Sequence, residues 1–133
     1  MALAQRAKAD FENYRKRASR DAAEAEKRGK ASLARELVPV VDNLERALKS
    51  AEASSDEAFE RGVALVLDEL RATLERAGVE AYDPAGERFD PAWHEALSTR
   101  ADEAESGTVV ETLERGYRLD GQVLRPARVI VSE

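Results

Sequence analysis

Small and apolar side chains recur every eleven residues along the first 50 positions of the chain. Two rows hold this period over four repeats, one with Phe11, Ala22, Leu33 and Leu44, the other with Ala7, Ala18, Gly29 and Val40. A third row, Tyr14 and Ala25, stops at Glu36. A period of eleven is about 3.67 residues per turn, which is typical of a nearly straight or slightly right-handed helix pair. The alternative is a solvated single helix, but exposed rings along an isolated helix would be unfavourable.

The middle of this seam is built from small side chains, namely Ala18, Ala22, Ala25 and Gly29. Paired helices can approach closely there, but they bury little apolar area. We therefore expect weak pairing in the middle of the seam and firmer packing from Leu33 to Leu48.

Two local signals divide the helical part of the chain. Pro39 lacks a backbone N–H and clashes with the preceding turn, which predicts a kink or break and a fresh helix to about Ser50. Ser54 and Glu57 have the spacing of a capping box. We expect the second helix from about Asp56 to Ala77, ended by Gly78.

These two helices carry apolar faces that are too wide for a single pair to enclose. The first face consists of Leu37, Val40, Val41, Leu44 and Leu48, and the second of Phe59, Val63, Val66, Leu70, Leu74 and Ala77. Doubling the pair in a symmetric dimer forms a four-helix bundle, which encloses both faces.

Short strands separated by turns are expected after Gly78, at 79–82, 96–99, 108–113, 116–119 and 122–131. Asp120-Gly121 predicts a type I′ hairpin, and Pro126 an edge position or a bulge. The fold class is therefore α+β. It comprises a long paired helix over 1–38, a four-helix-bundle region over 39–78, and a small antiparallel β domain over 79–133.

The composition argues against most kinds of catalytic chemistry. Cysteine is absent and His94 is the single histidine, so disulfides, thiolate sites and histidine metal sites are not expected. The pair His94-Glu95 lacks the second histidine of a zinc helix, since position 98 is Ser. No glycine loop precedes a helix to hold phosphate. No apolar run matches a membrane span or a signal peptide, so we expect a cytoplasmic protein. Because the catalytic and phosphate-binding patterns are missing, we expect that it is not an enzyme and has no cofactor.

The net charge of −6 is unevenly distributed: residues 1–50 hold 12 Lys and Arg against 8 Asp and Glu, and residues 51–133 hold 9 against 19. Arg15, Lys16 and Arg17, with Arg20 nearby, form the strongest basic cluster. This cluster could contact nucleic-acid phosphates, form the solvated flank of the helical seam, or dock on an acidic protein surface. The overall acidity argues against nucleic acid as the main partner.

Four motifs, in order along nearly the whole chain, resemble the GrpE family. They are FENYRKR at 11–17, LVPVVDNLERAL at 37–48, FDPAWHEAL at 89–97, and a spaced pattern of Gly116, Tyr117, Gly121, Leu124, Arg125, Ala127, Val129 and Val131. GrpE proteins are nucleotide exchange factors of the chaperone DnaK, an Hsp70. The family usually carries a longer acidic N-terminal tail, so the resemblance implies a truncated or naturally short member.

The resemblance implies a homodimeric co-chaperone that binds the DnaK nucleotide-binding domain. It implies that the β domain opens the nucleotide cleft and expels ADP, while the dimer itself binds no nucleotide, nucleic acid or membrane. It also implies long helices that tune exchange with heat. From the residues alone, the alternative is a dimeric coiled-coil scaffold or a nucleic-acid-binding protein that uses Arg15–Arg20.

Carried over motif by motif, the resemblance implies partner contacts at Arg15, Arg46, Lys49, Phe89, Leu113 and Val131. Lys49 departs from the family, whose residue there is acidic. Gly62 matches a helix glycine important to the family's complex, and we expect its direct role to be close helix packing. The expected dimer interface consists of Phe11, Tyr14, Leu33, Leu37, Val40, Leu44, Leu48, Gly62, Val66 and Leu70.

Overall fold

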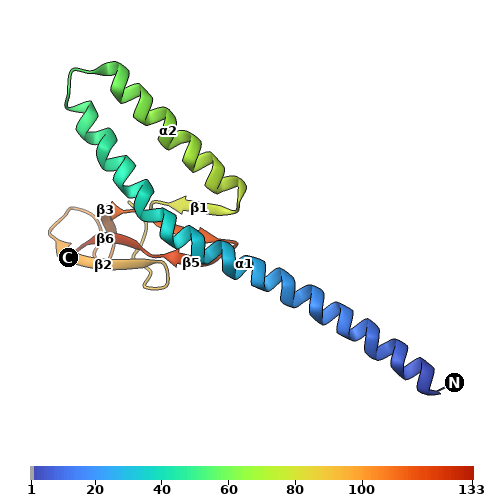
Figure 1. Ribbon diagram of the computed structural model, residues 1–133. Helices are drawn as coiled ribbons and strands as arrows, with labels where there is room; N and C mark the ends of the chain where they lie inside the picture. Colours follow the sequence, from blue (N-terminus) through green and yellow to red (C-terminus); the bar gives the residue numbers. More distant parts are fainter. Residues whose placement is uncertain (1) are drawn as a thin grey trace. The chain divides into compact units, whose positions relative to one another are not determined.

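A computed structural model describes residues 2–133 as two helices followed by six strands (Figure 1). The helices are α1 (Ala2–Glu52) and α2 (Glu57–Arg76). The strands are β1 (Val79–Tyr82), β2 (His94–Arg100), β3 (Val109–Glu114), β4 (Gly116–Leu119), β5 (Gln122–Arg125) and β6 (Ala127–Ser132). The predicted α+β class is confirmed. By internal contacts the chain divides into two compact units, Met1–Leu33 and Ala34–Glu133.

Helix α1 continues through Pro39, so the predicted break and fresh helix there are wrong. Proline removes one backbone hydrogen bond and crowds the preceding turn, which disfavours a helix interior. The side chains of Val38 and Val41 on either side are almost completely buried. Their packing in the second unit holds this turn helical, because tertiary burial outweighs local propensity.

The connection to α2 differs from the predicted capping box. The N-cap is Asp56, whose Oδ1 accepts a hydrogen bond of 3.1 Å from the backbone N–H of Phe59. Ser54 instead donates its hydroxyl to the carbonyl oxygen of Ala51 at 2.8 Å. Ser54 therefore caps the C-terminal end of α1, and Asp56 caps the N-terminal end of α2. Gly78, at φ +94°, follows the helix C-cap as expected.

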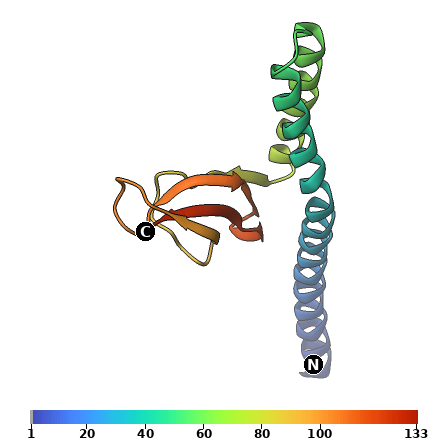
Figure 2. The ribbon, with the colours of Figure 1, turned by 90° about the vertical axis from the view of Figure 1, so that its left-hand side faces the viewer.

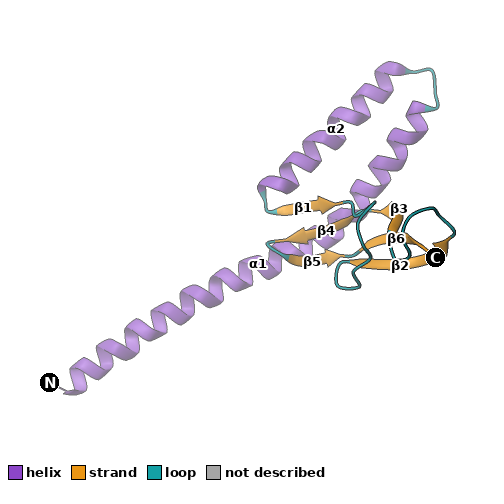
Figure 3. Ribbon diagram, turned by 180° about the vertical axis from the view of Figure 1, so that it is seen from behind, coloured by secondary structure: helices purple, strands orange, loops and turns teal. Residues whose placement is uncertain are grey.

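Within the second unit, α2 lies alongside the last part of α1 (Figure 3). Arg71 of α2 donates to Glu45 of α1, with Nη2 and Oε1 2.8 Å apart. Leu67 and Leu74 are buried on the same side of α2. Other apolar side chains of α2 remain open to solvent, because Phe59 is 57% exposed, Leu65 70% and Val66 55%. One chain thus covers only part of the wide apolar face of α2.

The strands gather in one domain that follows α2 (Figure 2) and form two sheets rather than one. The first sheet, in the order β1-β4-β5, is antiparallel. The second, in the order β2-β6-β3, is mixed, because β2 runs parallel to β6. The expectation of a purely antiparallel domain is therefore wrong for β2. Its partner lies far along the chain, and short-range turn signals cannot specify such a pairing.

The hairpin between β4 and β5 has the predicted geometry. Asp120 and Gly121 both have positive φ, 48° and 81°, as a type I′ turn requires. Strand β5 lies at the edge of its sheet and ends just before Pro126, where the chain passes into β6 of the other sheet. A residue without an N–H suits this position, where neither ladder needs a donor.

The core of the β domain consists of Val109, Ala127, Val129 and Val131, with Tyr82 and Phe89 packed against it. Tyr82 donates its hydroxyl to the carbonyl oxygen of Trp93 at 2.6 Å. The rings of Tyr82 and Trp93 meet edge to face, with centroids 5.8 Å apart. His94 is buried, and its Nδ1 accepts the backbone N–H of Asp90 at 2.9 Å. These contacts give His94 a role in packing the loop before β2.

Candidate partner-binding surface

Three of the predicted contact residues meet on one surface of the second unit. Arg46 and Lys49 of α1 and Leu113 of β3 line a hollow of about 110 Å³. Both basic side chains are exposed, and Leu113 is 48% exposed. We call Arg46, Lys49 and Leu113 the composite surface, because one helix and one strand contribute to it. The same hollow is also lined by the carboxylates of Asp42, Glu45 and Glu114, so the surface offers a partner two cations set among acidic groups, beside an apolar side chain.

A second hollow, of about 290 Å³, adjoins the composite surface. It shares Glu45, Lys49 and Leu113 with the first hollow and adds Leu67 and Arg71 from α2. The Nε of Arg71 is buried without a hydrogen-bond partner. Because residues of α1, α2 and β3 line the two hollows, the hollows lie where these three elements come together.

Asp42 of α1, which lines the first hollow, forms a bidentate ion pair with Arg125 of β5. The Nη1–Oδ2 distance is 2.5 Å and the Nη2–Oδ1 distance is 3.1 Å. The same Nη2 also donates to the carbonyl oxygen of Arg115 at 2.7 Å. The guanidinium lies 5.2 Å from the ring centroid of Tyr117. One side chain thus joins α1 to the segment between β3 and β4.

The electrostatics of this pair favour the charged form of Arg125. Burial opposes the charge, yet the hydrogen bond and negative charge of Asp42, with the charge of Glu114, raise the pKa of Arg125. Burial also raises the pKa of the Tyr117 hydroxyl, and the nearby carboxylates Glu45 and Asp42 raise it further. The ion pair is therefore maintained, and Tyr117 stays neutral, at physiological pH.

Of the two other predicted contact residues, Val131 lies in the core of the β domain, and Phe89 is only partly buried. Val131 is only 7% exposed, and Phe89 packs against the same core cluster. Both side chains help to hold the β domain together. The side chain of Val131 offers almost no accessible surface for direct contact with a partner.

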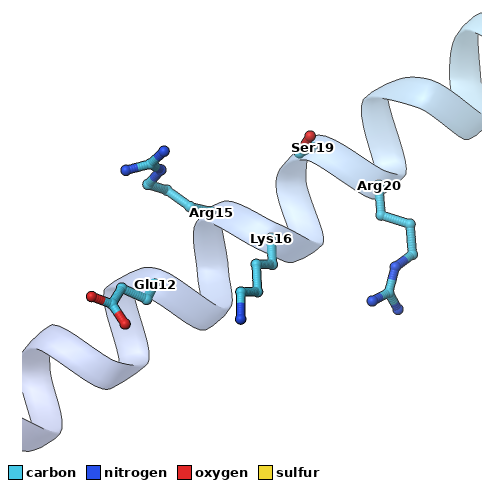
Figure 4. Close-up of a pocket in the computed structure, with 5 residues that line it drawn as sticks. All are labelled: Glu12, Arg15, Lys16, Ser19 and Arg20. Carbon is cyan, nitrogen blue, oxygen red and sulfur yellow. The ribbon is translucent and has the colours of Figure 1, made fainter.

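Arg15 lies in the first unit, on the exposed part of α1. Figure 4 shows its side chain and that of Ser19 leaving one side of the helix, while those of Lys16 and Arg20 leave the other. Glu12 lies one turn before them. All these side chains come from a single helix, so the cluster is an open charged surface rather than an enclosed site.

The predicted dimer-interface residues are mostly accessible in the single chain. Exposed positions are Phe11, Tyr14, Leu33, Val40, Gly62 and Val66, and half-buried ones are Leu37, Leu44, Leu48 and Leu70. A Cβ built on Gly62 would meet no atom within 4 Å. The close packing expected at Gly62 is therefore not made within one chain.

Sequence reasoning did not single out Asp42, Glu45, Arg71 or Arg125 as parts of the site. A signal was present for Arg125, which stands in a strand between the apolar residue Leu124 and Pro126. A charged side chain in such a position needs a partner, but the sequence alone could not place that partner 83 residues earlier.

Residues 2–133 contain neither a candidate metal site nor a candidate membrane span. No group of three or more His, Cys, Asp or Glu side chains in this range could hold a metal ion. Neither described helix is both long and apolar enough to cross a membrane.

Known proteins similar to this chain identify its family. The GrpE family model matches residues 2–133. Protein GrpE of Aromatoleum aromaticum is 43% identical over 128 residues, covering 96% of this chain and 66% of that protein. Protein GrpE of Legionella pneumophila is 43% identical over 96% of this chain and 64% of its own length. Protein GrpE of Francisella philomiragia is 43% identical over 95% of this chain and 67% of its own length. The chain thus spans about two thirds of the length of these relatives, and it belongs to the GrpE family.

Proposed function

We propose that this chain is a co-chaperone that binds the nucleotide-binding domain of a DnaK (Hsp70) chaperone and accelerates ADP release. The observation that carries this proposal is membership of the GrpE family along residues 2–133. The chain acts by binding rather than by catalysing a reaction. It is a ligand of the open nucleotide cleft, and it shifts the chaperone only as far as it prefers the open form to the closed one.

The composite surface is the proposed contact on the second unit. Arg46 and Lys49 attract acidic groups of the chaperone, and Leu113 supplies the apolar contact that excludes water around them. Arg15 is the proposed contact on the first unit. Phe89 and Val131 support this function by holding the β domain together.

The working form is proposed to be a homodimer. The open side of α2, with Phe59, Leu65 and Val66, is the kind of apolar face that a second copy covers in a four-helix bundle. In this arrangement residues 1–38 pair, residues 39–78 form the bundle, and residues 79–133 present the β domain. Sedimentation at micromolar concentration should show a dimer, and a monomer would contradict this part of the proposal.

The central test is release of a fluorescent ADP analogue from DnaK. Catalytic amounts of this protein should accelerate release strongly, because each dimer leaves after one exchange and acts again. No acceleration with a cognate chaperone would overturn the proposal. A steep salt-dependent gel shift with DNA or RNA would instead favour nucleic-acid binding by Arg15–Arg20.

A further inference from the structure

The ion pair between Asp42 and Arg125 links helix α1 to strand β5. Among residues 2–133, no other ion pair joins α1 to a strand. The two side chains are largely buried, Asp42 at 11% and Arg125 at 21% exposure. A charged pair placed here favours one arrangement of the two elements over others, because a displaced arrangement leaves a buried charge without its partner.

Arg125 reaches both sides of the composite surface at once. On the helix side it holds Asp42, one turn before Arg46. On the strand side it holds the carbonyl oxygen of Arg115, two residues after Leu113. Its Nη1 also lies 3.9 Å from the carboxylate of Glu114. The planar guanidinium makes these contacts in a fixed fork, which constrains direction as well as distance.

We propose that Asp42 and Arg125 are positioning residues that hold Leu113 in register with Arg46 and Lys49, so that the composite surface is ready for the chaperone before contact. This inference rests on the proposed function. Without the pair, the β domain remains folded but samples several orientations against α1, and binding has to select the competent one.

The first test uses three variants in the ADP-release assay: Asp42→Asn, Arg125→Lys and the double variant. Each single variant should raise the half-saturating concentration about tenfold, which is within the usual range for a broken two-residue interaction. The double variant should be no worse than either single one, because both changes remove the same link. Additive effects would show that Asp42 or Arg125 contacts the chaperone independently, and would overturn the proposal.

Arg118→Lys provides the matched control. Arg118 pairs with Glu80 at 3.1 Å and lies 5.7 Å from the ring centroid of Tyr82, so it resembles Arg125 in its contacts. Both of its partners belong to β1 in the same sheet, and it does not reach α1. The half-saturating concentration of this variant should stay within about twofold of the parent. An equal loss would mean that any such change in the β domain impairs binding.

A second test reads orientation directly and needs no chaperone. The chain lacks cysteine, so Ser50→Cys on α1 and Glu103→Cys in the exposed loop before β3 give two unique spin-label sites. Labelled chains are diluted with excess unlabelled chain, so that distances within one chain dominate. The distance distribution should broaden in Asp42→Asn and stay narrow in Arg118→Lys, with the near-ultraviolet circular dichroism of the β domain unchanged.

The outcomes separate the two proposals. If the parent protein fails to accelerate ADP release, the proposed function fails, while the distance measurement still decides whether the pair sets orientation. If the parent is active but Asp42→Asn leaves both the distance distribution and the half-saturating concentration unchanged, the positioning role is wrong. If Arg125→Lys proves unstable, Asp42→Asn alone decides, because it alters the helix side and leaves the strands intact.

Discussion

Gly116, the first residue of β4, has no room for a side chain. A Cβ built there would overlap the ring of Tyr82, whose hydroxyl is fixed by the carbonyl oxygen of Trp93. The glycine is therefore required by close approach rather than by an unusual backbone angle. The motif that contains Gly116 could be read from the sequence, but its physical reason could not, because Tyr82 lies in another strand.

Gly116→Ala should destabilise the β domain by about 1 to 3 kcal/mol, since the ring of Tyr82 must move out of a packed site. Thermal unfolding followed by the fluorescence of Trp93 measures this loss. In a Tyr82→Leu background the same alanine should cost much less, because the shorter side chain leaves space. Equal costs in the two backgrounds would show that the ring is not the obstacle.

Arg46→Ala should weaken binding of the chaperone without altering the fold. The side chain is exposed and its nitrogen Nη1 donates to Asn43 within the same helix, so little stability depends on it. Loss of one interfacial cation should raise the half-saturating concentration in the ADP-release assay by about three- to thirtyfold. Arg76→Ala, an exposed arginine at the end of α2, is the matched control and should leave this concentration unchanged.

Helices and strands could be predicted from the sequence where a local signal sets them. Gly78 ends α2, and Asp120-Gly121 forms the hairpin turn, because both need positive φ. The predicted helix break at Pro39 was wrong, because burial of the neighbouring valines outweighs a local rule. Prediction also failed for β2, which pairs with a strand more than 30 residues later. Long-range pairing leaves no mark within a short window of sequence.

The apolar face of α2 is only partly covered in one chain, and Gly62 lies beside its uncovered part. Leu67 and Leu74 are buried in the chain, whereas Val66 and the open Cα of Gly62 lie on the exposed side. An alanine at position 62 meets nothing in the single chain and would raise helix propensity there by about 1 kcal/mol. A loss of stability or of function in this variant would therefore indicate that position 62 contacts a second copy of the chain.

Gly62→Ala should weaken the dimer although it strengthens the isolated helix. If α2 packs closely on a second copy at this position, the added methyl group forces the helices apart. Analytical ultracentrifugation should show a dissociation constant raised about tenfold or more. Asp68→Ala is the control, because it also raises helix propensity but lies at an exposed position on another side of α2. It should leave the dissociation constant of the dimer unchanged. A tighter dimer in Gly62→Ala would place the glycine outside the interface.

For the molecule as a whole, the distribution of apolar area predicts two thermal transitions. The part of α1 in the first unit carries small seam residues and exposed rings, whereas the β domain has its own core. The seam should melt reversibly below the unfolding temperature of the β domain, because its pairing buries little area. Stimulation of ADP release should fall along with this first transition, which would tune exchange to heat.

Circular dichroism at 222 nm follows the helices, and near-ultraviolet signals with Trp93 fluorescence follow the β domain. Ala18→Leu with Ala22→Leu adds apolar area to the seam, so it should raise the first transition and leave the second in place. A single cooperative transition seen by all probes would contradict separate melting of the seam.

The candidate site could be predicted only in part. Contacts at Arg46, Lys49 and Leu113 could be expected from the resemblance to the family, but the proximity of these residues depends on how β3 packs near α1. The residues that hold them together, Asp42 and Arg125, are ordinary charged residues in the sequence. Their importance comes from burial and from a separation of 83 positions, neither of which a motif records.

The parallel pairing of β2 with β6 has a consequence for the order of folding. Strand β6 is the centre of its sheet, yet it is the last of the six strands in chain order. During synthesis β2 and β3 therefore cannot pair until β6 has been made. Both helices and the β4–β5 hairpin can form earlier from local contacts. We therefore expect the nascent chain to pass through a stage with formed helices and an unfinished sheet, whose open strand edges favour aggregation.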